Sequence, residues 1–476
     1  MRDLIQNDNM YKVVPWQHQK DAMSEAAGKK GFAYFMEQGT GKTKTVLDEA
    51  VLKLSEDREY LKVVIICPKS LMAAWENEII KNVNKGSYDI YRWGRKKKME
   101  SSGTSLSLDF SIYNIDAVNT QKGWQSITKK VCPYDTFLIV DESTTIKSIS
   151  AKRTQKVLYL GERAAYRRIL TGTPITKNPL DMYSQMMFLY PDFWGGQSYW
   201  AFKNTYAIMG GYKMKEVIGF KNQKQLTNKV DKASFRVTKE ECLTLPAKVY
   251  SRREVELTSQ QKKAYREKAR ELKEYAISEK TGQVYSKTMI VLNQLHQIVG
   301  GNLKDTNEQF PCDKIKEVLS IIEEGSGKTL IWCKYVQEIK RLKAVLEDNK
   351  IKTGAFYGEV HLKQREANVI AFNEEDMQVL ILQYQSGGMG LTLNAASTVI
   401  FFSNDYSYAN RIQAEDRCHR GGQTKSVTYI DLITNNTIDV KILNALRHKK
   451  SLSDLVLEEL SKDAPVNSDE EDELLF

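Results

Sequence analysis

The sequence is poor in the residues that build metal clusters and disulfide frameworks. Its 476 residues include only six cysteines and five histidines. None of the cysteines forms a C-x-x-C pair, and the side chains of the neighbours Cys418 and His419 diverge. This pattern fits neither a zinc finger nor a disulfide-stabilised domain, so we expect any metal ion to arrive with a substrate.

Long apolar runs are also missing. No run approaches the ~18 residues of a membrane helix, and residues 1–9 lack the basic start and apolar middle of a signal peptide. With 41% hydrophobic and 27% charged residues, the composition is typical of folded globular chains. We therefore expect no membrane partner, and a location in the cytoplasm of a bacterium or virus-infected host cell, or in the nucleus of a eukaryote.

The charge is unevenly distributed. The formal net charge is +10, but residues 463–476 contain six acids and no Lys or Arg, which leaves +16 on the rest. Such a surplus favours nucleic acid as a partner, because basic side chains neutralise phosphates and release counterions. The acidic tail predicts a disordered end, a competitor for a DNA groove, or a segment that docks on a basic protein partner.

The first half of the chain alternates short apolar runs with helical patterns. These runs are continuous, which is typical of strands buried on both faces of a parallel sheet. Apolar residues between the first two runs recur at helical spacing, so the pattern predicts a doubly wound α/β fold. The predicted strands are 32–36, 63–67, 110–113, 137–140 and 168–170.

The second half repeats this pattern. The length allows about two or three domains at ~150 residues each, and we expect two α/β lobes at 1–245 and 246–462 before the acidic tail. Few strand-like runs lie between the halves, so we expect a helical insertion at about 175–245 and a linker with the charged helix 259–278. The second lobe core is expected at about 313–450, with strands at 329–333, 352–357, 379–382, 398–402 and 427–432.

The first predicted strand leads directly into residues 37–43, the phosphate loop, and then into a helix. Glycines let the backbone N–H groups face a phosphate at the positive end of the helix. Lys42 adds a charge beside the β- and γ-phosphates, and the Thr43 hydroxyl can bind Mg²⁺. We predict an ATP site formed by Gly39, Thr40, Gly41, Lys42 and Thr43.

A second candidate follows the strand 137–140, which ends in Asp141 and Glu142. Open α/β sheets bind ligands at the carboxyl ends of their strands. Asp141 is therefore predicted to hold Mg²⁺, usually through water, while Glu142 orients the attacking water and takes its proton.

These residues resemble the motifs of superfamily 2 helicases, and most closely those of Swi/Snf-type DNA translocases. The segment 15–17 resembles the glutamine motif, which implies that Gln17 reads adenine. Residues 65–71, with Trp75, resemble motif Ia. The segment 141–144 departs from the family pattern D-E-x-H, because Thr144 stands at the fourth position.

The segment 170–175, followed by 178–180, resembles motif III, which implies a coupling role for Thr171 and Thr173. Residues 385–391 resemble motif V, whose glycines, here Gly388 and Gly390, allow the backbone to approach a sugar-phosphate chain or the nucleotide closely.

Gln413, Arg417 and Arg420 fall at i, i+4 and i+7, so a helix would present all three on one stripe. Guanidinium groups stay charged and donate in a planar fork that suits a γ-phosphate. Residues 413–423 also resemble motif VI, which implies that both arginines act as arginine fingers and that Gln413 binds the nucleotide.

The ordered matches cover about residues 14–446. They imply two RecA-like lobes that sandwich one ATP, with Lys42, Asp141 and Glu142 on the first and the two arginines on the second. Closing on ATP and opening after hydrolysis would then drive movement. Such a motor contacts phosphates rather than bases, and the candidate nucleic-acid contacts are Lys69, Ser70, Asn114, Lys334, Gln385 and Ser386.

Three functions fit the sequence. The first is a monomeric translocase on double-stranded DNA that remodels branched DNA or protein–DNA complexes. The second is a strand-separating DNA or RNA helicase, in which Tyr406 and Tyr408 could stack on a base. The third is a nucleic-acid-binding module whose ATPase has decayed.

Overall fold

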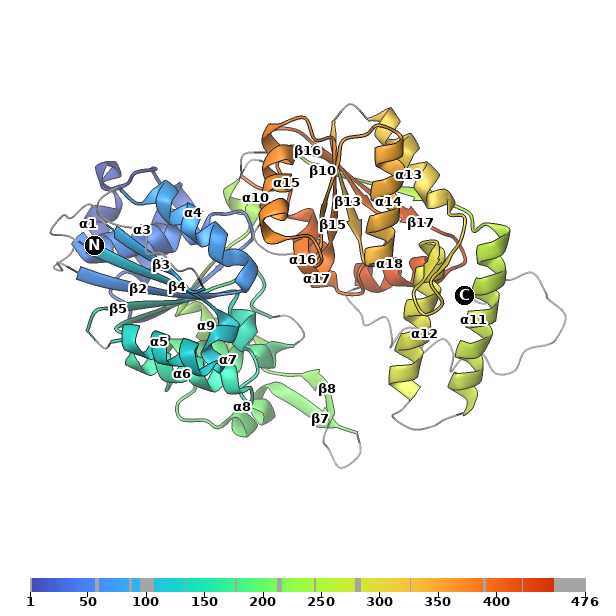
Figure 1. Cartoon of the computed structure of the whole chain (residues 1–476). Coiled ribbons are helices and arrows are strands. Elements are labelled where there is room, and N and C mark those ends of the chain that lie inside the picture. The colour runs from blue at the N-terminus through green and yellow to red at the C-terminus, as the bar shows by residue number, and fades with distance from the viewer. Residues whose placement is uncertain are drawn as a thin grey trace. The chain divides into compact units, whose positions relative to one another are not determined.

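The chain forms two compact units, unit 1 at Met1–Thr244 and unit 2 at Leu245–Phe476, in a computed structural model (Figure 1). The structure describes residues 2–448, except 56–59, 85–87, 95–106, 133, 176–177, 212–215, 244, 279–283, 326, 388–390 and 422. Gly388, Gly390 and the acidic tail lie outside the described residues.

Unit 1 is built on a parallel sheet. Within its described residues the sheet has seven strands, in the order β3-β4-β2-β5-β6-β1-β9. Central strands are buried along their length because helices cover both faces. The strands are β1 (Gly31–Met36), β2 (Tyr60–Cys67), β3 (Tyr88–Arg92), β4 (Ser107–Asn114), β5 (Thr136–Asp141), β6 (Tyr166–Leu170) and β9 (Ser234–Val237).

The helices of unit 1 lie on the two faces of this sheet (Figure 1). One face is covered by α5 (Gln121–Lys130), α6 (Lys152–Arg163) and α7 (Met182–Leu189), which share a core with the strands. In α6 the buried residues Thr154, Val157, Leu160 and Gly161 recur at helical spacing. The opposite face carries α3 (Lys42–Ser55) and α4 (Met72–Asn82), and α2 (Gln17–Ala26) packs beside α3.

Unit 2 has the same architecture. Its parallel sheet has six strands within the described residues, in the order β10-β17-β16-β13-β15-β14. Helices α13 (Asp313–Glu324) and α14 (Val336–Asp348) cover one face, and α15 (Leu362–Glu374) and α17 (Tyr408–Glu415) cover the other. The strands are β10 (Lys248–Glu254), β13 (Lys328–Cys333), β14 (Thr353–Phe356), β15 (Val379–Gln383), β16 (Ala396–Phe401) and β17 (Val427–Ile433).

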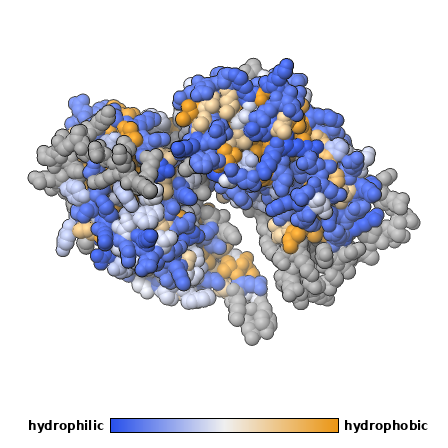
Figure 2. Space-filling view, in the orientation of Figure 1, coloured by the Kyte–Doolittle hydropathy of each residue, from blue (hydrophilic) through white to orange (hydrophobic). Residues whose placement is uncertain are grey.

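Smaller elements project from both sheets. In unit 2, α11 (Ser259–Ser278) and α12 (Val284–Val299) pack together and against α18 (Ile438–His448). In unit 1, α8 (Tyr199–Tyr206) leads into a hairpin of β7 (Ala207–Gly210) and β8 (Glu216–Phe220), and α9 (Gln223–Asp231) follows. The exposed Ile208 and Ile218 give this hairpin the apolar surface visible in Figure 2.

The predicted α/β fold is confirmed, and every apolar run expected to be a strand is one. The lobe layout differs from expectation in two places. The segment 175–245 is not purely helical, because β7, β8 and β9 lie in it and β9 completes the first sheet. The second sheet also extends upstream of 313–450, because β10 forms its edge. Among the described helices, none is long and apolar enough to span a membrane.

Candidate active site

The phosphate loop joins β1 to α3, as predicted. Gly39 and Gly41 have positive φ angles of 88° and 86°, which side chains rarely adopt. Thr40 is fully buried, and its hydroxyl donates to the carbonyl of Glu37 over 2.7 Å. Helix α3 begins at Lys42, so the N–H groups of its first turn lie beside the loop. The half-buried Thr43 lies in its first turn.

The Lys42 side chain bonds back to the end of β1 and the start of the phosphate loop. Its Nζ donates to the carbonyl of Met36 over 2.8 Å and to that of Glu37 over 3.2 Å. These carbonyls belong to the end of β1 and the start of the loop, so the ammonium is held over the carboxyl edge of the sheet. The positive charge of Lys42 also opposes the rise in the pKa of Asp141 that burial causes.

Helix α2 contacts the phosphate loop through residues that the motif did not single out. His18 Nε2 lies 2.8 Å from the carbonyl oxygen of Thr40, and Gln19 Nε2 donates to the carbonyls of Thr40 and Gly41, each over 3.3 Å. Gln17, the predicted adenine reader, is exposed and donates to Asp21 of its own helix. Helical spacing within α2 could have indicated that Gln17 and Gln19 point in different directions.

Asp141 and Glu142 end β5 at the same edge. Asp141 is only 7% exposed; its Oδ2 accepts the indole Nε1–H of Trp75 over 2.8 Å, and its Oδ1 accepts the Glu142 N–H over 2.9 Å. Burial is the main cause that raises the pKa of Asp141, and the negative charge of Glu142 raises it further. The hydrogen bond from Trp75 and the charge of Lys42 oppose that rise. Trp75 resembled part of motif Ia, but its bond to Asp141 was not predicted.

Glu142 has a left-handed backbone with φ 50° and ψ 60°. This conformation costs about 1–3 kcal/mol for a residue with a side chain and persists where the surroundings hold it. A short 3-10 helix, η4 (Ser143–Ile146), follows and is held to α7 by side-chain hydrogen bonds. The half-buried Glu142 therefore stands at a sharp turn between β5 and η4.

The segment 171–174 follows β6, which lies between β5 and β1. Thr171 is fully buried, and its Oγ1 accepts the Thr173 N–H over 3.1 Å. A Cβ added to Gly172 would lie 3.2 Å from the backbone nitrogen of Gln38, so this segment packs against the phosphate loop. The structure thus brings three predicted groups to the ends of three adjacent strands.

The predicted nucleic-acid contacts of unit 1 lie farther along this edge. Lys69 and Ser70 are exposed in η2 (Lys69–Leu71), directly after β2. Asn114 ends the neighbouring β4 in register with Cys67 of β2, and its side chain accepts the Ala117 N–H over 2.7 Å. The Asn114 oxygen therefore caps a helical turn, while Lys69 and Ser70 remain at the surface.

In unit 2, Arg417 and Arg420 converge on one carbonyl. Arg417 Nη1 donates to the Leu391 oxygen over 3.3 Å, and Arg420 Nη1 donates to the same oxygen over 2.9 Å. Arg420 also donates to Thr392 Oγ1 over 2.9 Å. Leu391 ends the segment that resembles motif V, so the two motifs meet here.

The expected single helix through Gln413, Arg417 and Arg420 is wrong. Helix α17 ends at Glu415, and the chain then tightens into i→i+3 turns that bury Cys418 in the core. Gln413 is on the helix, and its carbonyl accepts from Arg417 Nε over 3.1 Å. The arginines therefore come together through the turn and not through a helical stripe.

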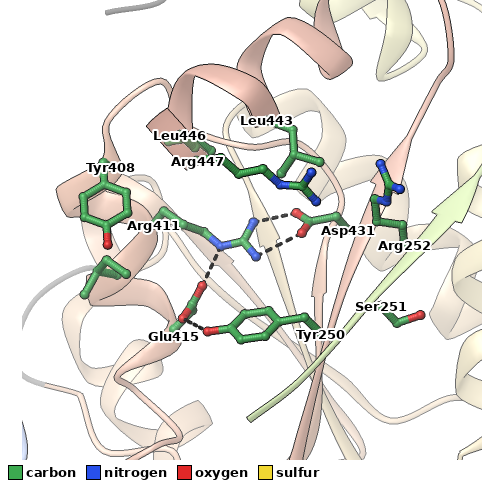
Figure 3. Close-up of a pocket in the computed structure, with 11 residues that line it drawn as sticks. Tyr250, Ser251, Arg252, Tyr408, Arg411, Glu415, Asp431, Leu443, Leu446 and Arg447 are labelled. Carbon is green, nitrogen blue, oxygen red and sulfur yellow. Dashed lines mark hydrogen bonds and ion pairs between the residues drawn. The ribbon is translucent and has the colours of Figure 1, made fainter. Parts of the chain in front are cut away.

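A buried ion-pair network holds α17 on the sheet (Figure 3). Arg411 donates through both terminal nitrogens to Asp431 of β17 and through Nε to Glu415 over 2.9 Å. Tyr250 of β10 donates to the other Glu415 oxygen over 2.7 Å. Beside this network is a cavity of about 300 Å³, which Tyr408 and Arg447 also line. The network therefore fixes α17, the helix that directly precedes Arg417 and Arg420.

Lys334 follows β13 but is directed inward. Its Nζ lies 2.7 Å from the centroid of the Tyr406 ring, and His296 stacks on that ring with centroids 5.6 Å apart. The Tyr406 ring is therefore covered, which disfavours its expected use as a platform for a base. Gln385 is exposed and Ser386 half-buried in the short helix α16 (Tyr384–Gly387), after β15.

Two parallel α/β units with a glycine-rich loop and a carboxylate pair at strand ends define a nucleotide-binding protein of two-lobed construction. Residues 14–302 match the SNF2-related domain, and residues 313–422 match the helicase conserved C-terminal domain. The first match covers more than half of the chain. The chain therefore belongs to the SNF2-related family, and its second unit carries a helicase conserved C-terminal domain.

Individual relatives are longer than this chain. It is 27% identical to an uncharacterized ATP-dependent helicase of Mycoplasma genitalium, over 87% of this chain and 39% of that protein. It is also 27% identical to the DNA annealing helicase and endonuclease of Homo sapiens, over 93% of this chain and 40% of that protein. The chain thus spans about two fifths of the length of these relatives.

Among solved structures the chain is similar to the SWI2/SNF2 ATPase core of Sulfolobus solfataricus in complex with dsDNA. The identity is 23%, the match covers 96% of each chain, and the TM-score is 0.43.

Proposed function

We propose that the chain is an ATP-driven translocase on double-stranded DNA that remodels branched DNA or protein–DNA complexes. One observation carries the proposal: the nucleotide candidates and the DNA candidates stand at the carboxyl edge of one sheet. Lys42 follows β1 and Asp141 ends β5, while Lys69 follows β2 and Asn114 ends β4. A rigid sheet can pass a change at one strand end to its neighbours.

In the proposed reaction, the phosphate loop and Lys42 hold the phosphates of ATP. Glu142 orients the attacking water and accepts its proton, and Arg417 and Arg420 of unit 2 neutralise the charge that develops on the γ-phosphate. The convergence of both guanidinium groups on the Leu391 carbonyl supports their use as a pair. Gln17, Gln413, Gly388 and Gly390 are proposed to surround the rest of the nucleotide.

Thr43 and Asp141 are suited to hold Mg²⁺, because hydroxyl and carboxylate oxygens are the ligands that this ion prefers. Asp141 ends β5 and Thr43 lies in the first turn of α3, both at the carboxyl edge of the sheet. When bound, the ion would neutralise negative charge on the phosphates of ATP.

The proposed DNA contacts are Lys69, Ser70 and Asn114 on unit 1, with Gln385 and Ser386 on unit 2. Polar and basic groups at strand ends suit phosphates, which carry no sequence information. The +16 charge outside the acidic tail supports a polyanionic partner. The similarity to a DNA annealing helicase supports DNA rather than RNA as the partner.

Displacement assays test the proposal. The chain is mixed with ATP and either a duplex that carries a third strand or a forked duplex, and Lys42→Ala is run beside it. We expect ATP-dependent release of the third strand without separation of the duplex, and no release by the variant. Separation of the forked duplex would favour the helicase alternative, and release that does not need ATP hydrolysis would contradict the proposal.

A further inference from the structure

The Gln185 side chain joins two loops of the candidate active site. It is fully buried in α7, and its Oε1 accepts the Ser143 hydroxyl over 2.6 Å. Its Nε2 donates to the carbonyls of Pro174 and Asp181, each over 2.8 Å. Ser143 directly follows Glu142, and Pro174 directly follows Thr173. One amide group therefore connects the carboxylate loop to the segment 171–174.

This connection lies where the backbone ladder ends. Asp141 of β5 and Leu170 of β6 are the last paired residues of their strands. Beyond them each chain follows its own turn, so side chains decide whether the two loops move together. Gly172 also packs on Gln38, so the segment 171–174 contacts the phosphate loop as well.

The connection also lies next to Thr144, the residue at which the segment 141–144 differs from the family pattern D-E-x-H. Thr144 occupies the position of the family histidine and is half-buried. Its neighbour Ser143 is fully buried and makes the bond to Gln185. Ser143 is next to the left-handed Glu142, so the tether bears directly on the orientation of that carboxylate.

We propose that Gln185 is a positioning residue that couples the carboxylate pair to the segment 171–174. The inference rests on the proposed function, because coupling has meaning only if DNA changes the rate of ATP hydrolysis. Gln185 acts through Ser143 and Pro174 and touches no reacting atom. Removing its amide should therefore uncouple DNA binding from hydrolysis.

Gln185→Met is the main variant, because methionine has a similar length and removes all three hydrogen bonds. Ser184→Ala is a matched control. Ser184 is the preceding residue, it is equally buried, and its hydroxyl donates to the Ile146 carbonyl of the same loop over 2.6 Å. It therefore tethers η4 to α7 without reaching Pro174. Ser143→Ala and the double variant with Gln185→Met complete a cycle.

The readout is the ratio of ATP turnover with saturating duplex DNA to turnover without DNA, together with the KM for ATP. We expect the ratio to fall by about fivefold or more in Gln185→Met, the lower end of typical coupling between sites. Ser143→Ala should lower the ratio similarly. The double variant should lower it no further, because each single change already breaks the same connection between Ser143 and Gln185. Ser184→Ala should keep the ratio within about twofold of the parent.

An unchanged ratio in Gln185→Met, or an equal loss in Ser184→Ala, would overturn the inference and leave Gln185 with a purely structural role. If circular dichroism shows that Gln185→Met does not fold, the comparison of Ser143→Ala with Ser184→Ala decides in the same way. A parent chain whose ATP hydrolysis does not respond to duplex DNA would overturn the proposed function itself, which separates the two failures.

Discussion

Trp75 donates its indole Nε1–H to Oδ2 of Asp141 over 2.8 Å, and both side chains are buried. Trp75 belongs to α4, which begins directly after the exposed Lys69 and Ser70. The bond therefore links the helix behind a proposed DNA contact to the proposed magnesium ligand.

Replacing Trp75 by phenylalanine tests this link. The change keeps an aromatic ring but removes the donor, so Asp141 loses a partner that orients it. Loss of such an outer partner typically costs about 10- to 100-fold in metal affinity or activity. We expect a higher Mg²⁺ requirement for ATP turnover in Trp75→Phe, measured by titration. Trp200→Phe, at a residue 67% exposed, should match the parent, and an equal response of both variants would refute the link.

Arg420 is predicted to act mainly in the reaction step. Arg420→Ala should change nucleotide binding little and lower turnover by about 10³-fold or more, the usual loss of an arginine finger. Single-turnover hydrolysis and fluorescent-nucleotide binding separate the two effects. Arg163→Ala, an exposed arginine of α6, serves as the control. A rate within tenfold of the parent would reject the role of Arg420.

Arg411 is predicted to be important for stability. Arg411→Met leaves the buried carboxylates of Asp431 and Glu415 without their main partner, which typically costs about 3–5 kcal/mol. Urea unfolding followed by circular dichroism measures the loss. The exposed pair Lys343–Glu347 gives the comparison, because Lys343→Met should cost less than about 1 kcal/mol. Similar losses in both variants would argue against the anchoring role.

The stability of the folded chain is predicted to depend on pH through Lys334. Burial lowers the pKa of Lys334 to about 7, although Asp405 and Glu338 act in the opposite direction. In the unfolded chain a lysine holds its proton up to about pH 10. Between these values the unfolded state binds more protons, so the free energy of unfolding should rise with pH.

Urea unfolding at pH 7.5, 8.5 and 9.5 measures this rise. We expect a shallower rise in Lys334→Met than in the parent, and an unchanged rise in Lys363→Met, which removes an exposed lysine of α15. If Lys334→Met keeps the full pH dependence of the parent, burial does not destabilise the ammonium group of Lys334.

Strands buried on both faces could be predicted from the sequence because they are continuous apolar runs, as in residues 137–140. The strands that escaped prediction were mostly edge strands. β3, β9 and β10 each lie at an end of their sheet, where one side is open. Polar residues are tolerated there, and β10 reads KVYSRRE. Local apolarity therefore does not reveal such strands.

The phosphate loop could be placed because its strand, glycines and helix are contiguous. The contacts that support the site could not, because they join residues far apart in the chain. Gln19 meets Gly41 across 22 residues, Trp75 meets Asp141 across 66, and Gln185 meets Ser143 across 42. Spacing likewise suggested one helix through Arg420, whereas α17 ends at Glu415 and Cys418 is buried in the turns that follow.

ATP turnover by the parent chain and by Lys42→Ala, each measured with and without duplex DNA, tests whether the phosphate loop drives DNA-dependent hydrolysis. We expect hydrolysis that duplex DNA stimulates in the parent and none in the variant, while both bind DNA with the same salt dependence. Normal turnover in Lys42→Ala would show that the phosphate loop does not hold the ATP.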